Sequence, residues 1–100
     1  MKTLILATTL TVLSFTANAE VNKEEKATCK DMSELAGRYM TLRQSGAPMA
    51  DIYSTAGDSK IIELMIIKAY EVTRFNTKEF RDRQVIKFKN DWFLACIKNK

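Results

Sequence analysis

The sequence predicts an all-α fold, a small bundle of three main helices plus one short helix, closed by one disulfide. Apolar residues recur every three or four positions in three long segments, which is the spacing of one face of an α-helix. Gly46, Pro48 and Gly57 interrupt the chain after the first of these segments, and a short helix fits between them. Cys29 and Cys96 lie in the first and the last segment, so a bond between them would close the bundle.

Residues 1–19 have the pattern of a secretory signal peptide, and residues 20–100 that of a single helical domain. Lys2 supplies the positive start, residues 4–15 are apolar, and Ala17-Asn18-Ala19 offers the small residues that a signal peptidase accepts. The apolar stretch is shorter than the roughly 20 residues of a membrane-spanning helix. We therefore expect an exported protein, located in a bacterial periplasm or, alternatively, secreted. An uncleaved N-terminal anchor is the competing interpretation.

The first helix is expected from about Lys26 to Gln44. Ser45 and Gly46 end its pattern, and glycine is the residue most often found just after a helix C-terminus. Its apolar face comprises Met32, Leu35, Ala36, Tyr39, Met40 and Leu42.

A short helix of about two turns is expected next. The fixed φ of Pro48 suits a first helical turn, and Met49, Ile52 and Tyr53 again repeat at three and four positions. Gly57 is expected to end this element.

Residues 61–72 form the most apolar part of the predicted domain, interrupted only by Glu63, Lys68 and Glu71. The segment follows Asp58-Ser59, two residue types that commonly cap a helix N-terminus. Its β-branched residues leave a buried strand as the alternative, but its length and the cap favour a helix. A helix that is apolar nearly all round should lie centrally and be contacted on most sides.

The last helix is expected to follow a connection over residues 72–75 and to reach about Lys98. Asn76 with Glu79 three residues later resembles a capping box, which predicts Asn76 as the N-cap. The apolar stripe of the helix comprises Phe80, Val85, Phe88, Trp92, Ala95 and Cys96, broadened by Ile86, Phe93 and Ile97.

Two cysteines in an exported protein favour one intramolecular disulfide, Cys29–Cys96, because the compartment is oxidising and only one pairing exists. The two long helices should then run antiparallel, with the apolar helix packed against both. The chain-entropy model assigns roughly 4 kcal/mol to a loop of this length. A redox pair lacks the C-x-x-C spacing, and two cysteines without histidine make a poor zinc site.

The composition argues against an enzyme and against a bound cofactor or metal. The chain has no histidine, which removes the histidine-dependent triads and metal sites. Ser59 beside Lys60 could suggest Ser–Lys catalysis, but at a helix start these residue types are far more often caps. No glycine-rich phosphate loop or calcium-binding loop is found in the sequence.

The charge pattern argues against nucleic acid as a partner. With 16 Lys and Arg against 12 Asp and Glu, the net charge is only +4. Phenylalanines lie between the basic residues of the last segment, but their spacing predicts core positions. The remaining positive potential could give weak contact with an anionic membrane surface.

We therefore expect a small exported, non-catalytic protein that binds one envelope or periplasmic protein, as an inhibitor, immunity, lysis-control or superinfection-exclusion factor. A periplasmic stress chaperone and a cationic membrane-acting factor are the alternatives, and the oligomeric state stays open. A candidate recognition edge is the turn over residues 45–58, with exposed side chains nearby, together with the basic face of the last helix. An ordinary connector and a solvated helix face are the competing interpretations. The candidate partner-binding residues are Arg43, Gln44, Tyr53, Arg81 and Lys89.

Four short stretches carry a resemblance to known proteins: Cys29-Lys30-Asp31-Met32, Arg43-Gln44-Ser45-Gly46, Ala69-Tyr70-Glu71, and Phe88 through Cys96. In these the chain resembles a group of small exported two-cysteine helical proteins of bacterial and phage genomes. The resemblance implies a fold and hardly a function. Thr28 through Met32 is also similar to the start of the periplasmic acid-stress chaperones of the HdeA type, which are small, helical and stapled by one disulfide. The second cysteine here lies in the final helix, whereas theirs lies in a central one.

Overall fold

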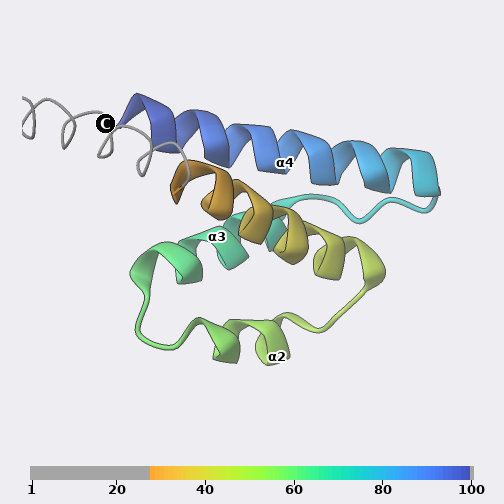
Figure 1. Cartoon of the computed structure of the whole chain (residues 1–100). Helices are drawn as coiled ribbons and strands as arrows, with labels where there is room; N and C mark the ends of the chain where they lie inside the picture. The colour runs from red at the N-terminus through yellow and green to blue at the C-terminus, as the bar shows by residue number, and fades with distance from the viewer. Residues whose placement is uncertain (1–27, 100) are drawn as a thin grey trace, which may run out of the picture.

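The computed structural model describes residues 28–99, and these form helices joined by short connections (Figure 1). In chain order they are an N-terminal helix over residues 28–45, α2 (Met49–Tyr53), the 3₁₀ helix η1 (Ser54–Ala56), α3 (Lys60–Glu71) and α4 (Lys78–Lys98). Residues 28–99 contain no strand, so the strand alternative for the apolar segment is wrong. The all-α bundle of three main helices and one short helix is confirmed. The predicted signal peptide and the predicted helix start at Lys26 lie outside the described residues.

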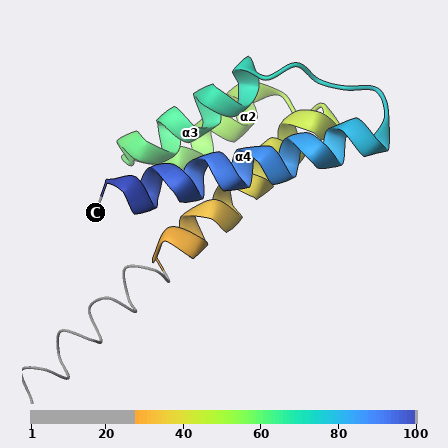
Figure 2. The same ribbon diagram turned by 90° about the horizontal axis from the view of Figure 1, so that it is seen from above.

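α4 runs antiparallel to both the N-terminal helix and α3, and α2 lies on the far side of the bundle from α4 (Figures 1 and 2). α3 lies between α2 and α4 and packs against α2 and η1. The arrangement expected for the two long helices is therefore the one observed.

Glycines end the N-terminal helix and η1. Gly46 has φ +90° and Gly57 has φ +60°, values that residues with a Cβ rarely adopt. The amide of Gly46 donates to the carbonyl of Arg43 at 3.1 Å, which closes the last turn of the N-terminal helix. The short helix is found, but α2 has only five residues and continues as η1.

The two later helices begin at hydroxyl caps. Ser59 is the N-cap of α3, as predicted, and its Oγ accepts from the Ile62 amide at 3.3 Å. The prediction of Asn76 as the cap of α4 is wrong, because Thr77 holds that position and its Oγ1 accepts from the Phe80 amide at 3.4 Å. Asn76 precedes this cap, and its carbonyl accepts from Arg81 Nη1 at 3.2 Å. The other half of the predicted capping box, Glu79, pairs instead with a later arginine of its own helix.

The core gathers buried apolar residues from three helices and η1. They are Ala36, Tyr39 and Met40 of the N-terminal helix, Ala56 of η1, Met65, Ile66 and Ala69 of α3, and Phe88 of α4. Trp92 packs against this cluster, with its ring edge-on to Phe88 at a centroid distance of 6.2 Å.

Burial of α3 and α4 is less complete than their apolar patterns predicted. Ile61 and Leu64 of α3 remain 48% and 44% exposed, and Ile86 of α4 remains 59% exposed. Phe80 and Phe93, which were expected in the α4 stripe, are also exposed. The reason is that α4 directs one face at the core, around Phe88, and α2, with five residues, is too short to cover α3 completely.

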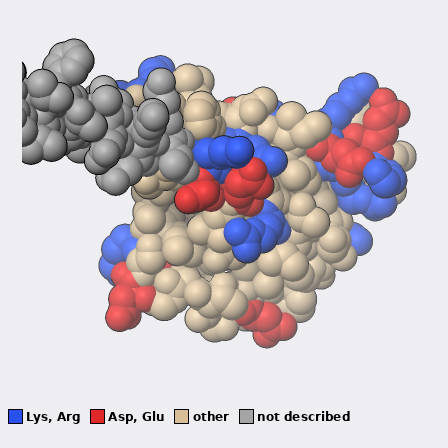
Figure 3. Space-filling view, in the orientation of Figure 1, with Lys and Arg blue, Asp and Glu red and all other residues tan. Residues whose placement is uncertain are grey.

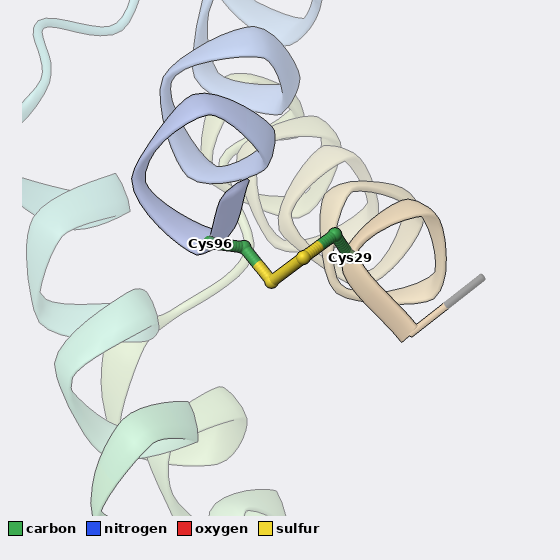
Figure 4. The surroundings of a disulfide bond; sticks show 2 residues. All are labelled: Cys29 and Cys96. Carbon is green, nitrogen blue, oxygen red and sulfur yellow. A yellow bond between two sulfur atoms is a disulfide. The ribbon is translucent and has the colours of Figure 1, made fainter. Parts of the chain in front are cut away.

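The disulfide joins Cys29, at the start of the described part of the N-terminal helix, to Cys96 in the last turns of α4 (Figure 4). The two Cα atoms are 5.5 Å apart, although the residues are 67 positions apart in sequence. This confirms the predicted pairing. Among residues 28–99, no helix combines the length and the apolar composition needed to cross a bilayer.

Candidate functional site

Three of the five candidate binding residues hold the connection between α3 and α4, which we define as the linker, residues 72–76. Arg43, on the last turn of the N-terminal helix, donates from Nε to the carbonyl of Val72 at 3.0 Å. Its guanidinium also lies 5.3 Å from the ring centroid of Tyr70, within cation–π distance. Arg43 is half-buried by these contacts.

Gln44 is 2% exposed, so the expectation of an exposed side chain is wrong. Its Nε2 donates to the carbonyl of Thr73 at 2.8 Å, and its Oε1 accepts from the amide of Phe75 at 2.9 Å. Its backbone carbonyl accepts from Arg74 Nε at 3.0 Å. The linker has no helix to satisfy its peptide groups, and the Gln44 amide satisfies two of them.

Arg81 completes this arrangement from the other side. Its Nη1 donates to the carbonyls of Asn76 at 3.2 Å and Phe75 at 3.5 Å. Arg43, Gln44 and Arg81 therefore each bond backbone groups of the linker and fix the turn between α3 and α4. Their contacts assign them a structural task, which local sequence patterns do not reveal because the partners of Arg43 and Gln44 lie 29 or more positions away.

Tyr53 is the candidate that stays exposed, at 39%, and it ties α2 to α3. Its hydroxyl donates to Glu63 Oε1 at 3.0 Å. This hydrogen bond raises the pKa of Tyr53, and desolvation and the negative charge of Glu63 raise it further. A second tyrosine, Tyr70, donates to the carbonyl of Ala47 at 2.6 Å.

Lys89 lines a groove between the N-terminal helix and α4. Its aliphatic stem lies on Gly37, where a Cβ atom would come within 2.8 Å of Cγ and Cδ. Its ammonium is 4.0 Å from Glu34 Oε2. The groove measures about 420 Å³ and is lined by Glu34, Gly37, Arg38, Thr41, Leu42, Val85 and Lys89. Figure 3 shows basic and acidic side chains intermixed on the face it views, and not a patch of one sign.

A second groove lies between α3 and α4, and we call it the α3–α4 groove. It measures about 270 Å³ and is lined by Leu64, Lys68, Phe88, Asp91, Trp92 and Ala95. Its lining is mostly apolar, and its two charged members already have partners within their own helices. Lys68 lies 3.8 Å from Glu71, and Asp91 lies 2.8 Å from Lys87. Ile61, one turn before Leu64, extends the exposed apolar surface along α3.

The described residues hold no group of three or more histidine, cysteine or acidic side chains placed to bind a metal ion. Ser59, which lies beside Lys60 and could suggest Ser–Lys catalysis, accepts the capping hydrogen bond of α3 from the Ile62 amide. The exposed apolar residues of α3 were not predicted as a site, since the pattern indicated that they would be buried.

No family model matches the chain, and the searches of the curated proteins and of the solved structures found no match.

Proposed function

We propose that this protein is exported and binds one other protein through the α3–α4 groove. The observation that carries the proposal is the apolar lining of that groove, next to the exposed Ile61 and Leu64. These two residues belong to the most apolar segment of the predicted domain, yet the bundle leaves them almost half uncovered.

Leaving this surface in water carries a cost that a partner would remove. Burying apolar surface is worth about 25 cal/mol per Å². The groove, at about 270 Å³, is smaller than the roughly 300–1,000 Å³ of typical small-molecule pockets, so it suits apolar side chains of a protein. Its antiparallel helical walls suit an amphipathic helix that lays its apolar face between them.

Export is supported by the disulfide between Cys29 and Cys96, since such bonds persist mainly in oxidising compartments. The predicted signal peptide, residues 1–19, points to the same location. The partner is accordingly an envelope or periplasmic protein, and its identity would distinguish an inhibitor from an immunity, lysis-control or superinfection-exclusion role.

Site-specific photo-crosslinking in the native host tests the groove. A photoreactive amino acid at position 64 is expected to give one discrete adduct with another protein, and the same amino acid at the exposed Thr55 of η1 is expected to give none. Adducts with many unrelated proteins would support the chaperone alternative. Adducts with lipid, together with leakage of anionic vesicles, would support the membrane-acting alternative.

Purified components then measure the contribution of the groove. Leu64→Glu is expected to weaken binding of the crosslinked partner by tenfold or more, about 1.4 kcal/mol, because it places a charge in an apolar contact. Leu42→Glu is the matched control, since Leu42 is similarly exposed but lines the other groove. Equal binding by the Leu64 variant and the unmodified protein would refute the groove as the site.

A further inference from the structure

The outward face of α4 carries a second apolar row, which we call the α4 seam: Ile86, Asn90, Phe93 and Ile97. Ile86 is 59% exposed, Phe93 38% and Ile97 37%, and Asn90 is exposed as well. Each residue of an α-helix turns by about 100°, so Ile86 and Asn90 point about 200° away from the buried Phe88 between them. The seam therefore faces away from the core of its own bundle.

The spacing of the seam is that of a coiled coil. Its residues follow one another at four, three and four positions, so Ile86 and Phe93 take d positions and Asn90 and Ile97 take a positions of a heptad. A single asparagine at an a position is a known device that fixes the register of a two-stranded coiled coil, because it pairs with the asparagine of the other strand.

One pair of charges beside the seam, Asp82 and Lys87, is complementary to the same pair of a second copy in parallel orientation. In a parallel pair, a g residue meets the e residue five positions later on the other helix. Here g is Asp82 and e is Lys87, so each acidic residue would meet a basic one across the seam, twice by symmetry. Both side chains are more than half exposed and form intrahelical pairs, Asp82 with Lys78 at 2.7 Å and Lys87 with Asp91 at 2.8 Å. Both can therefore turn to a new partner.

We propose that the α4 seam binds the same seam of a second copy of this chain, in a parallel two-fold dimer centred on Asn90. The α3–α4 groove lies on the side of α4 that carries Ala95 and Asp91, so it stays open in such a dimer. The dimer and the groove are thus separate surfaces, and either can fail without the other.

Sedimentation equilibrium of the disulfide-bonded protein over a concentration series tests the dimer. A reversible monomer–dimer equilibrium is expected. Ile86→Asn should raise its dissociation constant at least tenfold, and Asn90→Leu should lower it about tenfold and permit larger assemblies. Met49→Asn on α2, where Met49 is 38% exposed and lies outside the seam and both grooves, should leave it unchanged. A protein that stays monomeric to millimolar concentration, or an unaltered equilibrium in the Ile86 variant, would overturn the proposal.

A charge exchange tests the parallel register. Asp82→Lys and Lys87→Asp should each weaken the dimer several-fold, and the double variant should recover most of the loss, because opposite charges meet again. Further weakening in the double variant would rule out this pairing. All of these side chains are exposed, and circular dichroism of each variant would show that the helices are retained.

Discussion

At the scale of single residues, one buried amide holds a large part of the fold in place. Gln44 bonds both an amide and a carbonyl of the linker, and the structure leaves no buried side-chain nitrogen or oxygen unpaired among the described residues. A buried polar group costs little when both of its partners are present and much when one is lost.

Gln44→Ala is therefore expected to lower the free energy of unfolding by about 2–3 kcal/mol, since it leaves the amide of Phe75 and the carbonyl of Thr73 without partners. Urea denaturation followed by circular dichroism measures the change. Gln84→Ala is the control, because Gln84 is half-buried on α4 without a hydrogen bond from its side chain to another described residue. Its cost should stay within about 0.5 kcal/mol, and equal costs for the two variants would contradict the role of Gln44.

Tyr53 gives the fold a dependence on alkaline pH. Its pKa is raised above 10.0 in the folded state, chiefly by the hydrogen bond to Glu63. A group whose pKa is higher in the folded than in the unfolded state stabilises the fold when the pH is below its unfolded-state pKa. This contribution is lost as the pH rises through the folded-state pKa. The stability advantage of the natural protein over Tyr53→Phe should therefore be fully present below pH 10.0 and be lost as the pH rises through the raised pKa of Tyr53. Urea titrations at several pH values measure it, and a constant difference would argue against the bond.

Sequence reasoning identified the residues whose partners are local and missed those whose partners are distant. Ser59 was predicted as a cap because the amide that it accepts from lies three positions on. Gln44 was expected to be exposed, since nothing nearby in the sequence shows that the linker returns to it. The error therefore follows from the sequence separation of the two contacting segments.

At the scale of elements, substitutions at Asn76 and Thr77 can show which of these two neighbouring residues caps α4. Thr77→Ala is expected to cost about 1 kcal/mol of stability, because its hydroxyl accepts the hydrogen bond from the Phe80 amide. Asn76→Ala should cost far less, since Arg81 bonds the backbone carbonyl of residue 76, which the substitution keeps. Thermal unfolding of the two variants measures the difference. A larger loss of stability for the Asn76 variant than for the Thr77 variant would instead support Asn76 as the cap.

The helices themselves were predictable from apolar periodicity, but the extent to which each is covered was not. The period of α3 and α4 identifies helices and their inner faces, including Met65 and Phe88. It does not show how many neighbours surround them. Leu64 stays partly open because the α3–α4 groove separates it from α4, and Ile61 is exposed one turn earlier; both depend on the packing of the complete domain.

At the scale of the whole molecule, the disulfide determines how stable so small a core can be. Replacing both cysteines by serine should lower the free energy of unfolding by up to about 4 kcal/mol, because the unfolded chain regains the freedom of a loop that spans 67 positions. Urea unfolding measures this loss. A reductant should produce a similar loss in the natural protein and none in the double variant, and an unchanged midpoint after complete reduction would contradict the entropic account.

The global architecture was the most predictable feature. Three periodic segments and two cysteines near their outer ends suffice to define an antiparallel pair of long helices with an apolar helix beside them. The candidate site was the least predictable, because it consists of surfaces that remain open after the helices pack.

The Cys29–Cys96 bond also changes how the domain responds to mechanical tension. A pull on the two ends of the chain enters at one cysteine and leaves at the other, whose Cα atoms are 5.5 Å apart. The pulling force then passes through the disulfide. The chain segment between the two cysteines, which holds the linker and the α3–α4 groove, carries no load. An oxidised molecule tethered next to the two cysteines should hardly lengthen, whereas a reduced one should extend by the whole intervening segment.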